Sequence, residues 1–253
     1  MTRTRKVVMA SGLLYIILNR LGRTWGSTRA ERRRTLPGDE IVSDPSILTS
    51  HARTIDAPPS AIWPWLIQMG WHQGGWYTKR WVDRVLFPAN WAAAERLLPE
   101  FQNRKVGDFI PDGPPESQCG FVIERLEPER CLVLHSTTHI PRSWRERFGA
   151  RVDWTWAFVL EEAESESSRL IFRCRGVASP WWLRAAFALL IIPADFIMSR
   201  QMLSGIQKRV DLQLEREQFE AFVAEISRQQ TGAVAQSQSS RSESTFWAAA
   251  RAT

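Results

Sequence analysis

The chain has 253 residues, 44% of them hydrophobic, which suits a full core in one domain of roughly 180 residues once both ends are set aside. The net charge is +6, yet residues 1–34 hold nine Lys and Arg against one acid, so the rest of the chain carries a net charge of −2. This distribution excludes a basic nucleic-acid-binding face on the domain and makes an anionic membrane surface the expected partner of residues 1–34.

The N-terminal segment contains an apolar run at residues 7–18 with basic residues on both sides. A bilayer-spanning helix needs about 20 apolar residues, and no cleavage site of small residues follows the run. We therefore expect residues 1–26 to form an uncleaved anchor or interfacial helix, with an ordinary packed helix as the alternative. Residues 27–48 are polar, contain two prolines, and are interpreted as a linker. The predicted location is accordingly membrane-associated or cytoplasmic.

From residue 49 onward, strand and helix patterns follow one another. Alternating apolar residues, bounded by turn residues, predict strands at 49–56, 106–111, 119–126, 131–136, 151–160 and 169–175. Apolar residues at helical spacing predict short helices at 60–69, 81–86 and 91–98. Consecutive hairpins build an antiparallel sheet with one buried face, so the predicted fold class is α+β.

The strongest helix pattern covers residues 193–226. Apolar residues recur there every four positions, at Met198, Met202, Ile206, Val210 and Leu214, while the opposite side is charged. Pro193 suits a first helical turn because its missing N–H would be unbonded there. The apolar stretch before it, residues 179–192, is too short to span a membrane and is interpreted as a buried segment, with an interfacial anchor as the alternative. Residues 227–253 are predicted to be a disordered tail.

The sequence contains no recognisable cofactor or metal signature. The glycine-rich segment 70–77 lacks the spacing of phosphate-binding loops. The three cysteines are far apart, without a C-x-x-C pair, and the histidines lack the spacing of metal ligands. We therefore predict no cofactor, no metal site and no disulfide framework.

Several segments occur in an order that resembles a known family. They are residues 53–59 (RTIDAPP), 62–70 (IWPWLIQMG), 75–77, 98–102 with 106–108, 156–160 with 168–171, and 196–206. Together they resemble the SRPBCC superfamily of START-like, polyketide-cyclase-like and birch-pollen-allergen-like proteins. The resemblance implies a helix-grip fold over residues 49–226, in which a curved antiparallel sheet wraps around a long C-terminal helix and encloses an apolar cavity. No catalytic motif is shared across the superfamily, so no catalytic residue is carried over.

The first predicted function is binding of a hydrophobic small molecule, lipid- or polyketide-like, in this cavity at a membrane surface. The expected lining consists of residues from the sheet and the helix: Phe121, Ile123, Trp154, Trp156, Phe158, Arg173, Met202 and Ile206. Two alternatives stay open, because the same apolar residues would also form a filled core and Arg173 would also suit the outer sheet surface.

The second predicted function is a cyclase or dehydratase acting on a polyketide-like substrate. Such an enzyme needs a general acid or base inside the cavity, where burial shifts a pKa toward the working range. The candidates are His135, Asp153 and Tyr77, each of which also suits a purely structural role.

Overall fold

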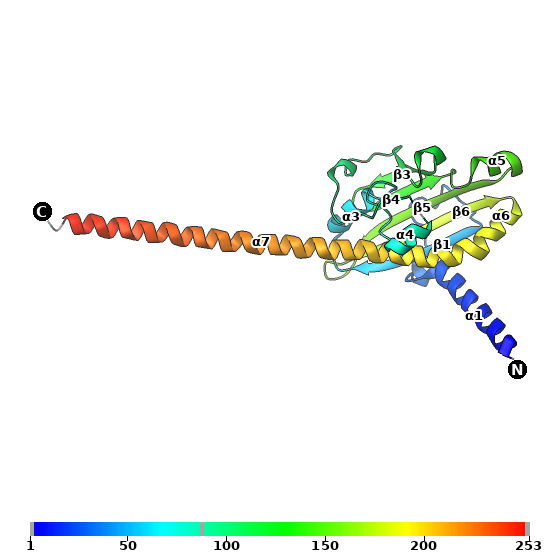
Figure 1. The fold of residues 1–253 in the computed structure, drawn as a ribbon, viewed down its shortest axis with the longest axis horizontal. Coiled ribbons are helices and arrows are strands. Elements are labelled where there is room, and N and C mark those ends of the chain that lie inside the picture. Colours follow the sequence, from blue (N-terminus) through cyan, green and yellow to red (C-terminus); the bar gives the residue numbers. More distant parts are fainter. Residues whose placement is uncertain (1–2, 87–88, 251–253) are drawn as a thin grey trace. The chain divides into compact units, whose positions relative to one another are not determined.

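A six-stranded antiparallel sheet forms the centre of the unit that comprises residues 1–210 (Figure 1). The computed structural model describes residues 3–86 and 89–250 of the chain. The strand order is β1-β6-β5-β4-β3-β2, with bounds Ile47–Ile55 (β1), Phe109–Pro111 (β2), Gly120–Glu127 (β3), Cys131–Ser136 (β4), Arg151–Glu162 (β5) and Ser168–Ser179 (β6). All six predicted strands are therefore present, although β2 is shorter than expected.

The strand register decides which side chains face the helix. Trp156 pairs with Cys174 and Phe158 with Phe172, so these residues share the inner face of the sheet. Arg173 lies between Phe172 and Cys174 in β6. Because successive side chains of a strand point to opposite faces, Arg173 belongs to the outer face.

One continuous helical stretch follows β6. It consists of α6 (Trp181–Ala186), the π-helical turn η3 (Phe187–Ile191) and α7 (Ile192–Ala250). The predicted helix start at Pro193 is therefore wrong, because the helix begins 12 residues earlier, at Trp181. Pro193 lacks the N–H that would bond the Leu189 carbonyl, and the backbone ahead of it takes π-helical geometry, a common accommodation of a disturbed hydrogen-bond ladder.

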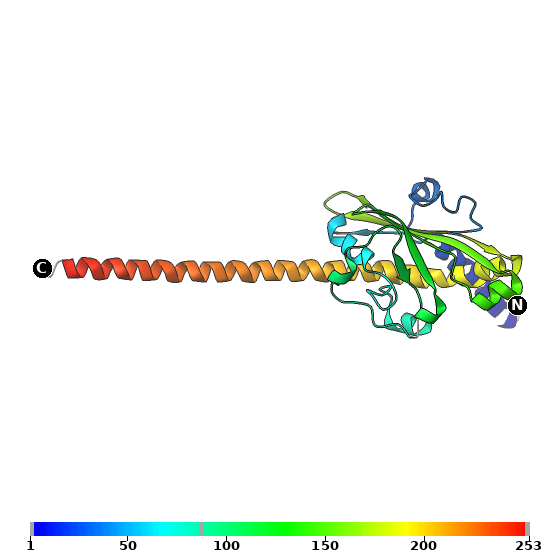
Figure 2. The same ribbon diagram turned by 90° about the horizontal axis from the view of Figure 1, so that it is seen from above.

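The first part of α7 lies across the inner face of the sheet (Figures 1 and 2). Met202, Ile206 and Val210 are fully buried, as their spacing predicts. At Gly205 the helix touches the backbone of the glycine-rich segment, since an added Cβ would lie 1.9 Å from the Tyr77 carbonyl oxygen. The antiparallel sheet and the long helix that it holds form a helix-grip fold, which confirms the predicted fold class.

The remaining helices are short except the first. They are α1 (Arg3–Thr24), α2 (Arg29–Arg33), α3 (Pro59–Ile67), α4 (Arg80–Leu86) and α5 (Arg142–Phe148), with single 3-10 turns at Pro99–Phe101 and Pro115–Ser117. The helix predicted at 91–98 is absent from the described residues of that stretch. Its backbone is bonded elsewhere, because Arg209 donates to the Ala94 carbonyl at 2.6 Å and the Ala94 N–H donates to the Gly74 carbonyl at 2.9 Å.

The predicted linker, residues 27–48, is part of the domain. Thr28 and Glu31 form a capping box that starts α2. Leu36 packs with Ala52 and Ile171 in a small apolar cluster. The linker interpretation is thus wrong, because the segment is polar in composition yet covers the outer sheet face with its few apolar residues.

A second unit begins at Asp211, and its described residues, 211–250, form the later part of α7. Apolar side chains at Phe219, Phe222, Val223 and Ile226 are exposed there, so the packed helix face ends earlier than the predicted boundary at 226. The predicted tail from residue 227 is helical as far as Ala250. That stretch contains no Pro and one Gly, Gly232, so its composition permits helix.

Candidate functional site

A cavity of about 230 Å³ lies between the inner sheet face and the junction of η3 with α7. Strands β1, β5 and β6 contribute one side, the helix contributes the other, and two loops contribute the end; the lining is Ile47, Thr49, Trp154, Trp156, Cys174, Phe187, Ile191, Ile192, Ala194, Asp195, Met198, Asp112 and His139. Its volume is below the roughly 300–1,000 Å³ of pockets for drug-sized ligands. It therefore suits a small apolar molecule or one end of a larger one.

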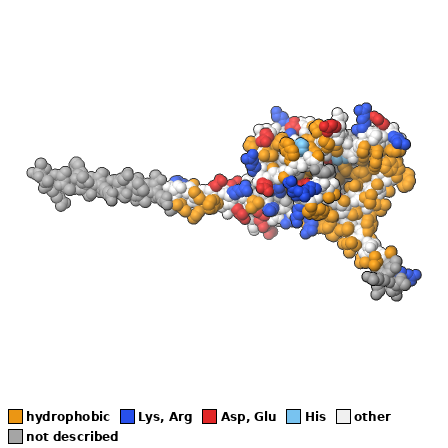
Figure 3. All heavy atoms as spheres, viewed as in Figure 1, with side chains coloured by type: hydrophobic (Ala, Val, Ile, Leu, Met, Phe, Trp, Pro, Cys, Tyr) orange, Lys and Arg blue, Asp and Glu red, His pale blue; other side chains and the backbone are white. Residues whose placement is uncertain are grey.

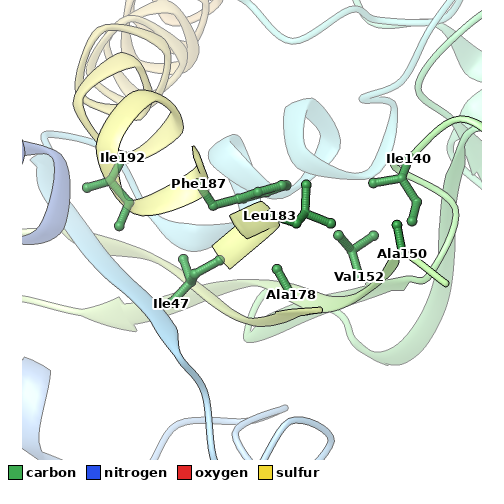
Figure 4. Packing of buried hydrophobic residues seen from close by; sticks show 8 residues of the cluster. All are labelled: Ile47, Ile140, Ala150, Val152, Ala178, Leu183, Phe187 and Ile192. Carbon is green, nitrogen blue, oxygen red and sulfur yellow. The ribbon is translucent and has the colours of Figure 1, made fainter. Parts of the chain in front are cut away.

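A buried apolar cluster forms the floor beside this cavity (Figure 4). Leu183 and Phe187 point from the helix onto the sheet, where Val152 and Ala178 meet them (Figure 4). Trp154 packs against the same cluster, with its ring centroid 5.3 Å from that of Phe187. The cavity wall is thus held by close-packed rings on the side of α6.

A hydrogen-bonded pair, His139 and Asp112, forms part of the cavity wall. His139 Nε2 lies 2.8 Å from Asp112 Oδ2, and its Nδ1 lies 2.7 Å from Ser136 Oγ and 3.2 Å from Trp154 Nε1. An indole N–H can only donate, so Nδ1 accepts and the neutral ring carries its proton on Nε2, toward Asp112. Neither ring nitrogen is left free to act on a ligand.

A second pair, His51 and Asp195, lies between β1 and α7. His51 Nε2 is 3.1 Å from Asp195 Oδ2, and Ser199 Oγ donates to the other carboxylate oxygen at 2.8 Å. The imidazole is fully buried and stacks on Phe172. Burial, and secondarily the charge of Asp195, raises the pKa of the nearby Cys174 thiol, which keeps that thiol neutral. On this side of the cavity both Asp195 carboxylate oxygens are therefore hydrogen-bonded, whereas His51 Nδ1 and Thr49 Oγ1 are buried without a hydrogen-bond partner.

The predicted apolar lining divides into two groups. Trp154 and Trp156 line the cavity. Five others lie deeper and are fully buried in a filled core: Phe121, Ile123, Phe158, Met202 and Ile206. Aromatic rings occupy that region, since Trp156 lies 4.7 Å from Phe121 and 5.3 Å from Trp76 between ring centroids. The hollow is thus confined to one end of the sheet–helix interface.

Arg173, the predicted polar group of the cavity, lies on the opposite side of the sheet. Its guanidinium donates to Asp39 Oδ2 at 2.6 Å, to the Glu31 carbonyl at 2.6 Å and to Ser50 Oγ at 3.1 Å. Its side chain is 2% exposed, and burial lowers its pKa although Asp39 acts against this. The placement in the cavity is wrong, because the alternation of β6 turns Arg173 outward, where the α2 segment covers it.

The predicted acid–base residues also lie outside the cavity. His135 Nε2 is 2.7 Å from Asp153 Oδ1, and both side chains are on the outer sheet face, 24% and 44% exposed. Tyr77 is buried beside α7, where its hydroxyl donates to the Trp65 carbonyl at 2.7 Å. Burial raises the pKa of Tyr77, so it stays protonated. All three residues therefore have structural partners and none lines the cavity.

Larger depressions occur elsewhere on the unit. One of about 680 Å³ lies outside the sheet, with Glu127, Arg130 and Glu161 among its lining, and one of about 580 Å³ lies between α4 and α7 beside Arg209. Both are wide and charged, which favours water over an apolar ligand. The smaller cavity fits the predicted ligand better because its lining is mostly aromatic and aliphatic.

The residues that the sequence did not reveal are the polar ones. Asp112 and His139 are 27 positions apart, and His51 and Asp195 are 144 apart. No local spacing marks such pairs, because the sheet and its loops bring them together only in the folded chain. The apolar pattern of residues 179–192 was the available signal for the helix side of the cavity.

No protein-family model and no curated protein matches the chain. Solved structures similar to it include protein jhp0584 from Helicobacter pylori, at 10% identity and a TM-score of 0.43 over 69% of this chain and 94% of that one. Another is a norcoclaurine synthase mutant from Thalictrum flavum, at 13% identity and a TM-score of 0.39 over 68% of this chain and 96% of that one. Protein MLL2253 from Mesorhizobium loti also has 13% identity and a TM-score of 0.39, over 65% of this chain and 97% of that one. The likeness is one of fold alone. The helix-grip assignment rests on the strand order and the long helix of the chain itself.

Proposed function

We propose that the protein binds a small apolar molecule, or the apolar part of a lipid- or polyketide-like one, in the cavity between sheet and helix. The cavity itself carries this proposal, because aromatic and aliphatic side chains of Trp154, Trp156, Phe187 and Met198 surround it. At about 25 cal/mol per Å², burying 200 Å² of ligand surface corresponds to about 5 kcal/mol before association costs.

The polar groups of the cavity restrict the ligand's charge. Asp112 and Asp195 are acidic, and the described residues that line the cavity include no Lys or Arg. An anionic headgroup would meet these carboxylates without a compensating cation, which is costly in an apolar environment. We expect a neutral ligand, or one that carries a hydroxyl or amine donor.

Native mass spectrometry after gentle purification tests the proposal. A bound apolar molecule of defined mass, released on unfolding, is the expected result. A ligand-free protein that also fails to take up an apolar fluorescent probe would contradict it.

We further propose that the protein works at a membrane, through an exposed apolar face made by two neighbouring helices. This apolar face comprises residues from all sides of the exposed part of α1, namely Val8, Met9, Leu13, Leu14, Ile16 and Ile17, with Leu189, Leu190 and Ile191 of η3. The helices are in contact, since Asn19 Nδ2 donates to the Ala188 carbonyl at 2.9 Å. Figure 3 shows hydrophobic side chains gathered along α1 and the adjoining part of the domain. Soluble monomers rarely expose a contiguous apolar patch of more than a few hundred Å².

Basic residues border the apolar face. Arg20 and Arg23 lie on α1 beside Leu189, and Arg184 is exposed on α6. Such residues attract anionic headgroups by about 1 kcal/mol each near the surface. The helical stretch Trp181–Arg228 also contains a segment long and apolar enough to cross a membrane, a property that core helices of soluble proteins share. Docking at the membrane surface agrees better with the structure than a membrane-spanning helix does, because α7 buries one face against the sheet and lines the cavity.

The second candidate, a cyclase or dehydratase, now depends on His139 and Asp112, because His135 and Asp153 lie outside the cavity. Proton transfer to a substrate would require His139 to give up a present hydrogen bond. Turnover of a polyketide-like substrate that is lost in His139→Gln while apolar probe binding persists would favour this enzyme over a binding protein.

A further inference from the structure

Two loops, the one between β2 and β3 and the one after β4, meet beside the cavity and bring together three residues with metal-binding chemistry. Asp112 follows β2, Cys119 precedes β3 and His139 follows β4. The loops are tied to one another independently of these side chains. The Asp112 N–H donates to the Cys119 carbonyl at 2.9 Å, and the Thr138 hydroxyl bridges the Gly120 N–H and carbonyl at 3.1 and 3.0 Å. The three side chains are thus held in place by the fold.

The potential ligand atoms of Asp112, Cys119 and His139 lie within 4.8 Å of one another. The side chains of Asp112 and His139 are 7% and 11% exposed, and Cys119 is half-buried. Asp112 Oδ2 is bonded to His139, but the buried Oδ1 has no hydrogen-bond partner. A buried carboxylate oxygen without a partner is costly, and a bound cation would remove that cost.

We propose that Asp112, Cys119 and His139 bind a divalent metal ion of the zinc class, with a fourth coordination position left open. One thiolate, one imidazole and one carboxylate form a donor set that suits Zn²⁺, and three protein ligands with an open position are typical of its reactive sites. The two negative charges of thiolate and carboxylate neutralise the ion, so the site as a whole is uncharged. The proposal goes beyond apolar ligand binding and does not depend on it.

The surroundings of His139 fit a metal ligand. An ion on Nε2 replaces the proton that now points to Asp112, and the neutral ring then carries its proton on Nδ1. Ser136 Oγ, 2.7 Å away, can accept that proton's hydrogen bond, as partners of metal-bound imidazoles usually do. Trp154 Nε1 would lose its present acceptor, so metal binding is coupled to a Trp that lines the cavity.

The position of the three ligands also gives the ion access from two sides. Asp112 and His139 line the apolar cavity, whereas Cys119 lines a surface groove with Phe109 and Gln118. The ion would therefore occupy the wall between the groove and the cavity. Its open position would be available to a hydroxyl or amine of a ligand in the cavity, which agrees with the acidic character of that end.

Metal content and cobalt spectroscopy on the full chain test this proposal. The purified protein, incubated with Zn²⁺ and dialysed, is expected to retain one ion per chain. Replacement by Co²⁺ is expected to give a thiolate-to-cobalt charge-transfer band. Cys119→Ser should abolish that band and weaken metal binding at least about 100-fold, whereas the matched control Cys131→Ser, a thiol buried on the outer sheet face, should bind like wild type. Asp112→Asn provides a second variant at the site, and circular dichroism verifies that each variant is folded.

Two results would overturn the proposal. One is wild-type protein that retains no Zn²⁺ or Co²⁺ after dialysis. The other is a folded Cys119→Ser variant whose metal affinity and cobalt spectrum equal those of wild type. Apolar probe binding is measured separately on the same samples, so failure of the metal site and failure of the ligand cavity are distinguishable.

Discussion

The inner face of the sheet and the part of the outer face around Arg173 are both buried, but by different means. Phe172 and Cys174 of β6 point inward to aromatic rings and the cavity, whereas Arg173 between them points outward into a network with Asp39. The inner face is covered by the helix that the sheet grips, and the outer face by residues of the polar segment before β1. The comparison shows that a charged residue in an alternating strand does not imply a solvated face, because a short polar segment can cover and pair it.

The largest expected effect concerns the outer face. Arg173→Ala removes the closer ion-pair partner of the buried Asp39 carboxylate and leaves only Arg175, at 3.7 Å; removing one member of a buried pair typically costs about 3–5 kcal/mol. Urea denaturation should show that loss in the free energy of unfolding. If Arg173→Ala unfolds at the wild-type urea concentration but loses apolar ligand binding, the assignment of Arg173 to the outer face is wrong.

The second effect concerns the apolar face of α1, which nothing in the described part of the chain covers. The double substitution Leu13→Asp and Ile16→Asp places two charges where side chains 59% and 62% exposed would enter lipid. Cosedimentation with phosphatidylglycerol-containing vesicles should fall about 100-fold, or ~2.7 kcal/mol. Deleting residues 1–34 is a poorer test, because it also removes the Glu31 and Arg34 carbonyls that bind Arg173.

The control for this experiment carries the same charges elsewhere. Val85→Asp with Val106→Asp alters side chains 72% and 60% exposed outside the apolar face. Vesicle binding should stay at the wild-type level. Equal binding by both double variants would remove the support for a membrane-docking face.

The third effect concerns the inner face. Ala194→Phe extends a ring at the cavity wall and should weaken apolar probe binding about tenfold, or ~1.4 kcal/mol. Leu190→Phe enlarges a side chain of the same helix that is 68% exposed and does not line the cavity, so it should bind the probe normally. Fluorescence titration compares the three proteins, and a similar affinity for all of them would place the ligand elsewhere.

The smallest effect is a pH dependence of the outer face. Burial alone would raise the pKa of Glu31, but hydrogen bonds from Arg169 and Thr28 outweigh it and lower the pKa from 4.5 to about 2. Since the folded-state pKa is lowered, Glu31 stabilises the fold fully above pH 4.5, and that contribution is lost as the pH falls toward 2. Between pH 5 and pH 2.5 the Glu31→Gln variant should lose about 1 kcal/mol less of its free energy of unfolding than wild type does. Thermal unfolding at the two pH values measures this difference. An unchanged pH profile would contradict the ion pair with Arg169.

Much of the fold followed from local patterns. Alternation located the strands, and the spacing of Met202, Ile206 and Val210 identified the buried side of α7. Trp154 and Trp156 were likewise found by alternation. Periodicity could not distinguish the filled centre around Phe158 from the hollow end near Phe187, because both are built from the same residue types.

The polar part of the site depended on distant contacts. Asp112 and His139 meet only because β2 and β4, both antiparallel to β3, end on the same side of the sheet, where the loops after them lie together. Residues 27–48 looked like a linker because the few apolar residues that pack, such as Leu36, are scattered among charged ones. A polar composition therefore does not exclude packing, because a few apolar residues at the right positions are enough to hold a segment against the sheet.

Photo-crosslinking with an apolar diazirine probe tests most directly where the ligand binds. The wild-type protein should be labelled on peptides that contain Trp154, Phe187 and Met198, and Ala194→Phe should suppress that labelling. Labelling confined to α1 or to the outer sheet face, unchanged by Ala194→Phe, would contradict a ligand held between sheet and helix.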